Sequence, residues 1–541
     1  MYVDDSRRTL STHRRPHAQR LTAPFPATRH PLEDWLDRPA VRRVLRWLST
    51  RGGDGRTRFE AICANFDNRE LRGFDRLHYG FFNLLIEFGL RQAKLDREGM
   101  KKNLFHHPPT VKALALTARS IARYGLTTPQ RFTAPLFVVW NLTQACNLTC
   151  RHCYQEAQHK PLGDELTTAQ KLNAVDQMAD NFVPFVAFAG GEPLVSPDLW
   201  PVLERCRERG VHVTVATNGT LLTPANCERL RDAGVKYVEV SLDSPDPAQH
   251  DTFRGVPGAW RHTTQGIRNA VAAGIRTGMA CCFTRETVTR AGEMVQLAID
   301  LGCKTFAFFN FIPVGRGRVM LHEDLTPGQR EGLLHLLQQR FTEGRINVIS
   351  TAPQFGRACI AYGAPDGVFA TGHAGGGRGG KAMVLARYLG GCGAGRCYCC
   401  IQPTGVVTPC VYIPKPVVGD LRRQPLAEIW ENELFRTLSD RDDYGDHCGV
   451  CDFRRYCGGC RARALSYTGD IQAGDPGCIY NQTMWDELAR SVGDGRDAAL
   501  PAETRLAPAV GPAKAAEPLF PCSEAPDELR RLIHLQHDRE D

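Results

Sequence analysis

The sequence predicts an α/β protein: a partial, TIM-like (β/α)6 barrel, preceded by a helical region and followed by a cysteine-rich domain. Between residues 134 and 313, short apolar segments alternate six times with amphipathic helical segments, as in parallel sheets. Apolar residues before residue 130 recur at helical spacing, and cysteines are dense after residue 385. A chain of 541 residues is long enough for roughly two to four domains.

The composition is that of a globular protein. Hydrophobic residues make up 42% of the chain and charged residues 23%. No stretch approaches the roughly 18 consecutive apolar residues that a membrane-spanning helix needs, so we expect no membrane span. The net charge of +8 is mild for this length, and no basic stripe interleaved with aromatic residues occurs, so we expect no nucleic-acid partner.

Cysteine is the unusual residue type, with 21 copies. The first twenty residues are rich in arginine but lack a following apolar run, so we predict a disordered basic tail and no secretory signal. We therefore expect a cytoplasmic location, where thiols stay reduced. So many cysteines in that compartment indicate metal or redox chemistry and not disulfides.

Residues 1–130 form the first predicted region, which is helical behind its basic tail. Apolar residues at helical spacing occur in two runs: Phe81, Leu84, Leu85 and Phe88, then Val111, Leu114, Leu116 and Ile121. The region shows no catalytic motif. Its lone cysteine, Cys63, is expected to be a small buried residue.

The barrel is predicted over residues 134–320. Its six strands are expected at Leu136–Leu142, Phe185–Ala189, His212–Thr217, Tyr237–Leu242, Gly278–Phe283 and Phe306–Ile312. Segments such as 198–209 and 265–273 supply the intervening helices. Parallel strands of this kind gather their chemistry at their carboxyl ends.

Three segments follow the barrel. Residues 321–384 are predicted to form a bridge, with one helix around 332–341 and a mobile glycine-rich loop at 372–380. Residues 385–482 are cysteine-dense with little periodicity, as expected where metal clusters replace a hydrophobic core. Residues 490–541 are predicted to be a mostly disordered tail with a short helix near 529–535.

Three cysteines, Cys146, Cys150 and Cys153, follow the first predicted strand in the spacing C-x3-C-x2-C. Three thiolates can hold three corners of a 4Fe-4S cluster and leave one iron open. An open iron can chelate S-adenosylmethionine, whose reductive cleavage releases a 5'-deoxyadenosyl radical. A zinc site is the alternative, but zinc takes four ligands in pairs, and no partner pair follows in the barrel.

This motif resembles that of the radical S-adenosylmethionine (radical SAM) superfamily, in which an aromatic residue, here Tyr154, follows the last cysteine. Gly190-Gly191-Glu192-Pro193 resembles the family's GGEP motif, where the glycines let backbone approach a ligand and the glutamate can accept a hydrogen bond from the methionine ammonium. The resemblance implies further cofactor-binding residues at Asn218, Ser241, Asp243 and Arg254. A solvated surface charge is the alternative for Arg254.

The cysteines near the carboxyl end resemble the SPASM extension of radical SAM enzymes, which holds two auxiliary 4Fe-4S clusters. The resemblance assigns Cys392, Cys410, Cys460 and one intervening cysteine to the first cluster. It assigns Cys448, Cys451, Cys457 and Cys478 to the second. A zinc ribbon formed by Cys448, Cys451, Cys457 and Cys460 is the alternative, and it leaves Cys392, Cys410 and Cys478 unexplained.

The intervening ligand is one of Cys397, Cys399 and Cys400, and spacing favours Cys399. Cysteines without ligand spacing, among them Cys206, Cys227, Cys303 and Cys522, are expected to be packed small residues. Cys281 and Cys282 lie on the fifth predicted strand, where one of the two must face the barrel interior, so a catalytic thiol is an alternative there.

Residues 391–396, 401–405 and 457–464 are similar to the branch of the superfamily that includes enzymes of haem and haem d1 synthesis. That branch acts on propionate side chains of an iron tetrapyrrole, for which Arg396, Arg461 and Arg463 are predicted carboxylate partners. Val411 stands where sulfatase-maturing members carry an aspartate, which argues against base-assisted oxidation of a peptide serine or cysteine.

Three hypotheses follow. The first is a radical SAM enzyme that modifies tetrapyrrole propionates. The second is a peptide or protein maturase whose amino-terminal region docks a leader peptide. The third, a non-catalytic iron-sulfur carrier, is disfavoured because a carrier has no need of an open iron. Either enzyme would require an electron donor such as ferredoxin or flavodoxin.

Overall fold

The computed structural model describes residues 31–53, 55–66, 72–73, 77, 79–84, 87, 107–363, 367–370, 376–378 and 386–493. The predicted basic tail, Leu85, Phe88 and the tail beyond residue 493 lie outside these residues. Part of the glycine-rich stretch is described: Gly376–Arg378 forms strand β9, which pairs antiparallel with β8 (Val368–Ala370), where we predicted a mobile loop.

A ten-stranded sheet forms the centre of the molecule, in the order β12-β11-β10-β1-β2-β3-β4-β5-β6-β7. The six predicted strands are confirmed and pair in parallel: β1 (Phe137–Thr143), β2 (Phe185–Gly190), β3 (His212–Thr217), β4 (Tyr237–Ser241), β5 (Arg276–Cys282) and β6 (Thr305–Phe309). A curved parallel sheet therefore brings the carboxyl ends of these strands to one side of the molecule.

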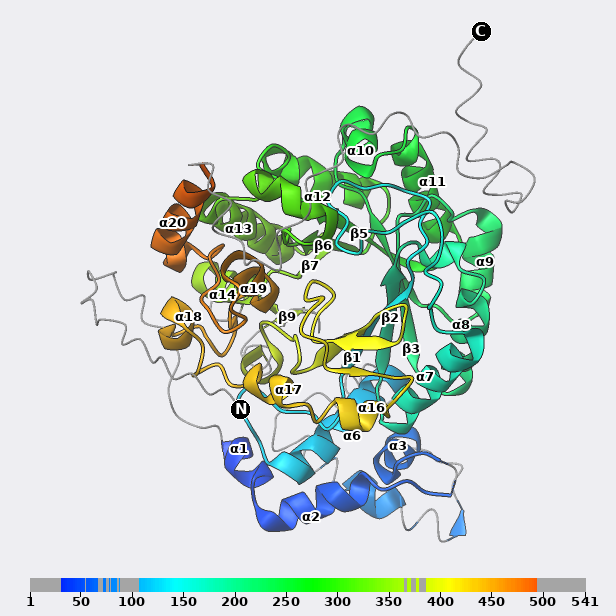
Figure 1. Ribbon diagram of the computed structural model, residues 1–541. Helices are drawn as coiled ribbons and strands as arrows, with labels where there is room; N and C mark the ends of the chain where they lie inside the picture. The colour runs from blue at the N-terminus through cyan, green and yellow to red at the C-terminus, as the bar shows by residue number, and fades with distance from the viewer. Residues whose placement is uncertain are drawn as a thin grey trace, which may run out of the picture.

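An outer layer of helices surrounds the strands (Figure 1). It comprises α7 (Thr168–Asp180), α8 (Leu199–Glu208), α9 (Pro224–Asp232), α10 (Pro247–Arg254), α11 (Ala259–Ala272), α12 (Ala291–Asp300) and α13 (Pro327–Glu343). Outward-facing strand residues such as Val186, Phe188 and Val238 are fully buried against this layer. Several inward-facing positions are small, for example Ala187 and Ala307, and the interior is a cavity where many barrels have a packed core.

The sheet continues beyond the predicted barrel at both edges. After α13, β7 (Asn347–Ser350) pairs in parallel with β6, so the bridge supplies a seventh strand. From the cysteine-dense region, β10 (Tyr398–Ile401) pairs in parallel with β1, and β11 (Val406–Thr408) and β12 (Gly419–Asp420) extend that edge antiparallel. The barrel and the cysteine-rich region therefore share one sheet.

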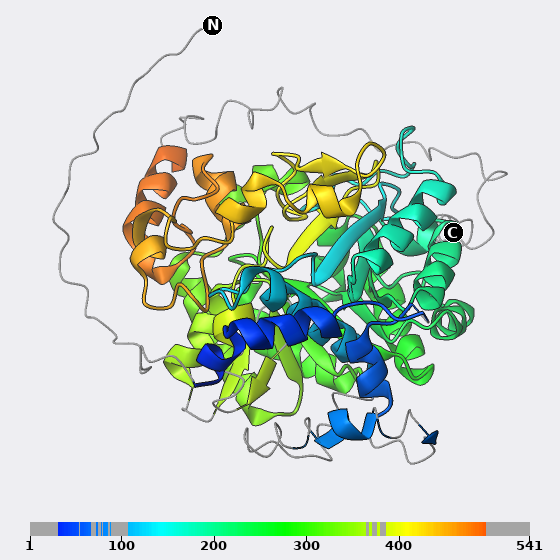
Figure 2. The same cartoon turned by 90° about the horizontal axis from the view of Figure 1, so that it is seen from below.

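The cysteine-rich region continues as short helices: α16 (Leu426–Ile429), α17 (Glu433–Thr437), α18 (Asp446–Val450), α19 (Arg461–Thr468) and α20 (Gln482–Gly493). Figures 1 and 2 both show α18 to α20, in orange, beside α13 and α14 (Gln354–Tyr362). Among the helices of the described residues, none has the length and hydrophobicity that crossing a bilayer requires.

The helices before the sheet whose bounds the structure gives are α1 (Pro31–Leu36), α2 (Pro39–Leu48), α3 (Arg58–Ala64) and α6 (Pro108–Tyr124). α3 begins at a capping box, in which the Thr57 hydroxyl and the Glu60 carboxylate accept each other's backbone N–H. α2 packs on α6 (Figure 2), where Arg42 Nη2 donates to the carbonyls of Ala122 and Arg123. These bonds satisfy carbonyls that the end of α6 leaves open.

Candidate active site

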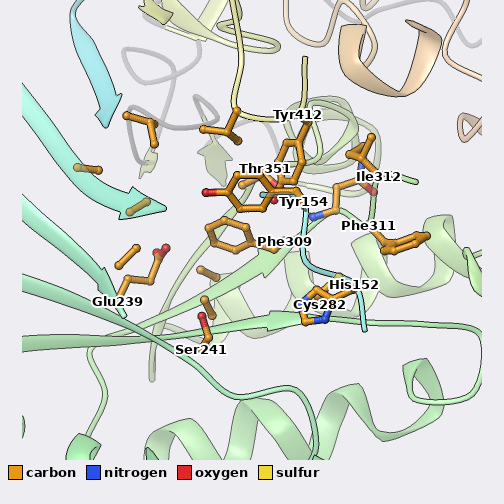
Figure 3. A pocket seen from close by; sticks show the side chains of 18 of the residues that line it. His152, Tyr154, Glu239, Ser241, Cys282, Phe309, Phe311, Ile312, Thr351 and Tyr412 are labelled. Carbon is orange, nitrogen blue, oxygen red and sulfur yellow. Dashed lines mark hydrogen bonds between the residues drawn. The ribbon is translucent and has the colours of Figure 1, made fainter. Parts of the chain in front are cut away.

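A cavity of about 360 Å³ lies at the carboxyl ends of the parallel strands (Figure 3). Its wall includes six cysteines from two distant parts of the chain: Cys146, Cys150, Cys153, Cys392, Cys410 and Cys460. Tyr154 and Tyr412 lie on one side of this cavity, and Glu239 and Ser241 lie on the other. The cysteines predicted for the catalytic cluster and those predicted for the first auxiliary cluster therefore face one space.

The loop after β1 presents its three thiols toward that space, each with a hydrogen-bond donor nearby. Leu148 N–H donates to Cys146 Sγ at 3.4 Å, and Ala157 N–H donates to Cys153 Sγ at 3.4 Å. Arg254 Nη1 lies 3.7 Å from Cys150 Sγ. Burial raises the pKa of the Cys146 and Cys150 thiols, so these side chains need a positive partner to ionise. Cluster iron would supply that charge, and the donor set fits it.

Arg316, which sequence reasoning missed, holds this loop from behind. Its backbone N–H donates to the Cys153 carbonyl at 3.0 Å, Nε to the Cys150 carbonyl at 2.9 Å and Nη1 to the Ala157 carbonyl at 2.7 Å. Its Nη2 is buried and has no partner among the described residues, and the side chain lines the cavity. The preceding Gly315 has φ +58°, and a Cβ there would lie 2.4 Å from the Cys153 carbonyl oxygen.

The GGEP-like turn lies against the same loop. Gly190 and Gly191 line the cavity, and a Cβ on Gly191 would lie 2.0 Å from the Ala145 carbonyl oxygen, so only glycine fits there. Glu192 and Pro193 do not line the cavity. Instead, the buried Glu192 carboxylate accepts hydrogen bonds from Leu194 N–H, Thr217 Oγ1 and Asn218 N–H at 2.8 to 3.1 Å. These bonds join the ends of β2 and β3.

Burial raises the pKa of Glu192 to about 7, although its three hydrogen-bond donors oppose the shift. Both oxygens accept bonds from the protein itself. The direct bond from a methionine ammonium to Glu192 stays a prediction, because a carboxylate has about four lone-pair sites and three of them are used here. Glu192 also contacts Asn218, a residue that lines the cavity and whose side chain donates to Asn147 Oδ1 at 2.8 Å.

The remaining residues predicted to bind the cofactor surround the cavity. Ser241, Asp243 and Arg254 all line it. Asp243 and Arg254 form a buried ion pair, which replaces the solvated surface charge considered for Arg254. Tyr154 packs edge-on against Tyr412, with ring centroids 5.0 Å apart, and its hydroxyl donates to Asn141 Oδ1 at 2.9 Å.

The auxiliary cysteines lie in two neighbouring groups. Burial and the nearby Cys392 raise the pKa of the Cys460 thiol, and they also raise that of Cys410. Cys457 interacts with Cys478 and Cys448, and Cys451 with Cys448. A backbone hydrogen bond of 2.9 Å from Cys392 N–H to the Cys457 carbonyl joins the groups. Among the described residues, no three candidate ligands converge closely enough to hold a single metal ion.

Buried arginines stand beside these cysteines with unused donors. Arg461 has Nε and Nη2 without partners in the described structure, and its charge interacts with both Cys448 and Cys392. Arg357 Nε is likewise unpartnered, and its charge interacts with Cys478 and Cys457. Donors left free beside buried thiols fit anionic clusters, whose sulfur atoms accept hydrogen bonds.

The structure separates the three candidates for the intervening ligand. A Cβ on Gly393, the residue after Cys392, would lie 2.7 Å from Cys397 Sγ, and the Cys397 thiol interacts with Cys392. Cys397 and Cys399, the residue we favoured, both pack in the main hydrophobic core, and Cys399 lies on the opposite face of β10 from Tyr398, which lines the cavity. Cys400 Sγ accepts from Asn141 Nδ2 at 3.5 Å. The contacts therefore favour Cys397 over Cys399.

The prediction that Arg396, Arg461 and Arg463 are substrate partners is wrong. All three are buried, and none lines the cavity. Arg396 donates to the Leu389 and Gly390 carbonyls, and Arg461 donates to the Ile471 and Ala473 carbonyls. Arg463 pairs with Asp324 and donates to Asn310. The sequence shows that these arginines flank cysteines, but it does not show that their side chains are buried in the protein away from the cavity.

The other cysteines are packed as expected where the structure describes them. Cys63, Cys206, Cys227 and Cys303 are buried. Cys281 and Cys282 both line the cavity, and Cys282 N–H donates to Asp243 Oδ1 at 2.9 Å. Burial raises the pKa of both thiols, which opposes a nucleophilic role. Cys522 lies outside the described residues.

Comparison with known proteins decides the family. Residues 140–298 match the radical SAM superfamily, and residues 392–452 match SPASM, an iron-sulfur cluster-binding domain. The AdoMet-dependent heme synthase of Methanosarcina barkeri is 35% identical over 349 residues, which cover 64% of this chain and 97% of that protein. The chain belongs to the radical SAM superfamily. Its two matched domains imply 4Fe-4S clusters and S-adenosylmethionine as cofactors, and the chain is an enzyme.

Further proteins are similar over most of the chain. The pre-heme d1 synthase of Dinoroseobacter shibae is 30% identical over 358 residues, 64% of this chain and 88% of that protein. The subtilosin biosynthesis protein AlbA of Bacillus subtilis is 28% identical over 353 residues, 64% of this chain and 72% of that protein. Streptococcus suis SuiB, solved with S-adenosylmethionine, shares the fold at TM-score 0.54 and 16% identity, covering 78% of this chain and 93% of that one.

Proposed function

We propose that this radical SAM enzyme modifies propionate side chains of an iron tetrapyrrole. The observation that carries the proposal is the single cavity that Cys146, Cys150 and Cys153 share with Cys392, Cys410 and Cys460. The relatives named as heme and pre-heme d1 synthases support this substrate class. When bound, the catalytic cluster and S-adenosylmethionine would supply a radical that abstracts hydrogen from an unactivated carbon.

The ligands of the three clusters are part of the proposal. Cys146, Cys150 and Cys153 would hold the catalytic cluster. Cys392, Cys397, Cys410 and Cys460 would hold the first auxiliary cluster, with Cys397 in place of Cys399. Cys448, Cys451, Cys457 and Cys478 would hold the second. The grouping of these thiols and the free donors of Arg461 and Arg357 support this assignment.

The cavity wall supports an apolar substrate body with few polar contacts. Phe309, Phe311, Ile312 and Tyr412 supply apolar and aromatic surface. Arg316 Nη2 is a buried donor without a partner among the described residues, and we assign it to a carboxylate of the cofactor or the substrate. Val411 lines the cavity where the sulfatase-maturing pattern has an aspartate, so that base is missing.

Gly190, Gly191, Glu192, Pro193, Asn218 and Ser241 would bind the cofactor, with Tyr154 beside it. Asp243 and Arg254, which form an ion pair, would bind it as well. We propose the limits 134–320 for the radical SAM core, 321–384 for the bridge and 385–482 for the SPASM-like region. β7 of the bridge and β10 of the SPASM-like region both belong to the sheet of the core. The helical region 1–130 and the tail 490–541 lie outside both matched domains.

A low-potential carrier such as ferredoxin or flavodoxin would deliver electrons, and we place the enzyme in the cytoplasm. None of the twenty cysteines in the described part of the chain forms a disulfide. Reduced carriers of that class are available there.

A peptide or protein maturase is the second candidate. The likeness to AlbA, a bacteriocin biosynthesis protein, favours it. Under this reading the amino-terminal helices would dock a leader peptide.

The experiment offers the reduced, reconstituted enzyme S-adenosylmethionine together with iron-coproporphyrin, sirohaem derivatives or peptides encoded nearby. Formation of 5'-deoxyadenosine and the substrate mass are followed in parallel. Loss of carbon dioxide from a tetrapyrrole is expected. A mass change confined to a peptide would contradict the proposal, and the Cys146, Cys150, Cys153 triple alanine variant controls for cluster-independent change.

A further inference from the structure

A second cavity, of about 650 Å³, lies between the amino-terminal helices and the barrel. Four arginines line it: Arg46 and Arg51 at the end of α2 and just after it, and Arg119 and Arg123 on α6. Thr133 and Phe182, which also line it, precede β1 and β2. The arginine pocket therefore lies at the amino ends of the strands, opposite the cysteines.

The arginine pocket is held in shape by a buried ring. The guanidinium carbons of Arg51 and Arg119 lie 4.5 and 4.7 Å from the centroid of Phe182, which is itself buried in the core. Arg51 Nη2 also donates to the carbonyls of Ala179 and Asp180 at 3.0 and 3.1 Å. The side chains of Arg51 and Arg119 are thus fixed in place and are not free to move apart into solvent.

The positive charge of the pocket is not balanced by the described residues. Asp180 is the one carboxylate in its lining, 3.8 Å from Arg51 and already paired with Arg209 at 2.7 Å. Arg123 pairs outside the lining with Glu431. In the described structure, neither Arg46 nor Arg119 has a hydrogen-bond acceptor or an acidic partner. Burial and the charges of Arg51 and Arg123 lower the pKa of Arg119, which indicates unrelieved repulsion.

We infer that the arginine pocket binds a compact polyphosphate group, either free or as part of a nucleotide. A guanidinium group can donate two parallel hydrogen bonds to two phosphate oxygens. The charges of several phosphates would balance the four arginines, which the single carboxylate in the lining cannot do. The hydroxyls nearby are occupied: Ser49 and Thr50 donate to the carbonyls of Leu45 and Trp47. Recognition would therefore depend on the guanidinium groups. The site does not depend on the proposed function, because it shares no lining residue with the active-site cavity.

The test is calorimetric titration of the full-length holoenzyme with pyrophosphate, ATP and citrate at fixed salt. Pyrophosphate and ATP should bind, and affinity should fall about tenfold or more in Arg119→Gln and further in Arg46→Gln/Arg119→Gln. The matched control is Arg207→Gln/Arg231→Gln, which removes two exposed arginines of α8 and α9 and should change affinity less than about twofold.

Arg46→Gln alone, at an exposed position, tests the pocket if Arg119→Gln does not fold. Binding of ATP without pyrophosphate would overturn the polyphosphate assignment in favour of a nucleoside site. Binding of citrate as tight as that of pyrophosphate, equal losses in the control variant, or no binding of any probe would overturn the inference. Cleavage of S-adenosylmethionine should be unchanged in these variants, which separates this site from the proposed reaction.

Discussion

Arg254 and Asp243 form a buried ion pair, in which Nη2 and Nε lie 2.5 and 2.6 Å from the same carboxylate oxygen, Oδ2, and the same guanidinium reaches Cys150 Sγ. The pair joins the end of α10 to the end of β4 beside the predicted catalytic ligands. Burial alone would raise the pKa of Asp243, but Arg254, His152 and His250 outweigh it and lower that pKa. The aspartate is therefore charged when the site is assembled.

Removing one partner of this pair should destabilise the fold strongly. Arg254→Gln leaves the Asp243 charge buried and uncompensated, so we expect the free energy of unfolding to fall by about 3 to 5 kcal/mol. Asp243→Asn/Arg254→Gln should lose less than the sum of the single variants. Urea titration of all three measures this, and additive losses would show that the two side chains do not interact.

Arg316→Gln should loosen the catalytic cluster before it affects the rest of the enzyme. The carbonyls of Cys150 and Ala157 would lose their donors, at about 1 to 3 kcal/mol each. We expect faster loss of about four of roughly twelve iron atoms to a chelator and faster hydrogen exchange over residues 146–158. Arg290→Gln is the control, because its partner Glu293 lies outside residues 146–158. Equal iron loss in both variants would contradict the role of Arg316.

Substituting Cys397 and Cys399 in turn tests the fourth ligand of the first auxiliary cluster. Cys397→Ser should lower the iron content of reconstituted enzyme by up to about four atoms, because a cluster normally takes four thiolates. Cys399→Ser should keep its iron and show only the cost of a hydroxyl in the core. The reverse result would restore Cys399 as the ligand.

Glu239 should make stability depend on pH. Burial raises its pKa to about 7 from an ordinary value of 4.5, although the Tyr237 hydroxyl lowers it somewhat. The Glu239 carboxyl faces the internal cavity and is shielded from bulk solvent. Between pH 4.5 and 7 the folded state keeps the Glu239 proton, whereas the unfolded state loses it. The stability that this proton contributes is therefore complete below pH 4.5 and is lost as pH rises through 7.

Glu239→Gln should remove that dependence. Between pH 5 and pH 8 the wild-type enzyme should lose about 1 to 3 kcal/mol more stability than the variant. Melting at both pH values measures the difference, with Glu204→Gln on the exposed face of α8 as control. Parallel pH profiles for wild type and Glu239→Gln would mean that this carboxyl is ionised throughout.

The parts of the fold that local pattern governs were predictable. His212–Thr217 matches β3 to the residue, because a continuous run of strand-forming residues is bounded by polar turns. β7 and β10 were not predicted, because four residues each are too short for periodicity, and β10 forms only by pairing with a strand far away in sequence.

The site was predictable where spacing encodes chemistry and unpredictable where side-chain direction decides. Cys146, Cys150 and Cys153 reach one cavity because they occupy one loop. Whether Arg396 points into that cavity or into the core depends on backbone carbonyls that tertiary packing brings to it. Arg316 carries no spacing signal, since its three acceptors are about 160 residues away.

The pairing of β10 with β1 has a consequence for the nascent chain. During synthesis, β1 leaves the ribosome roughly 250 residues before β10, so the barrel can assemble from β2 onward while the other side of β1 stays unpaired. An unpaired strand edge invites pairing with other chains. Translation of the cysteine-rich region, which contains β10, is therefore what covers this edge of β1.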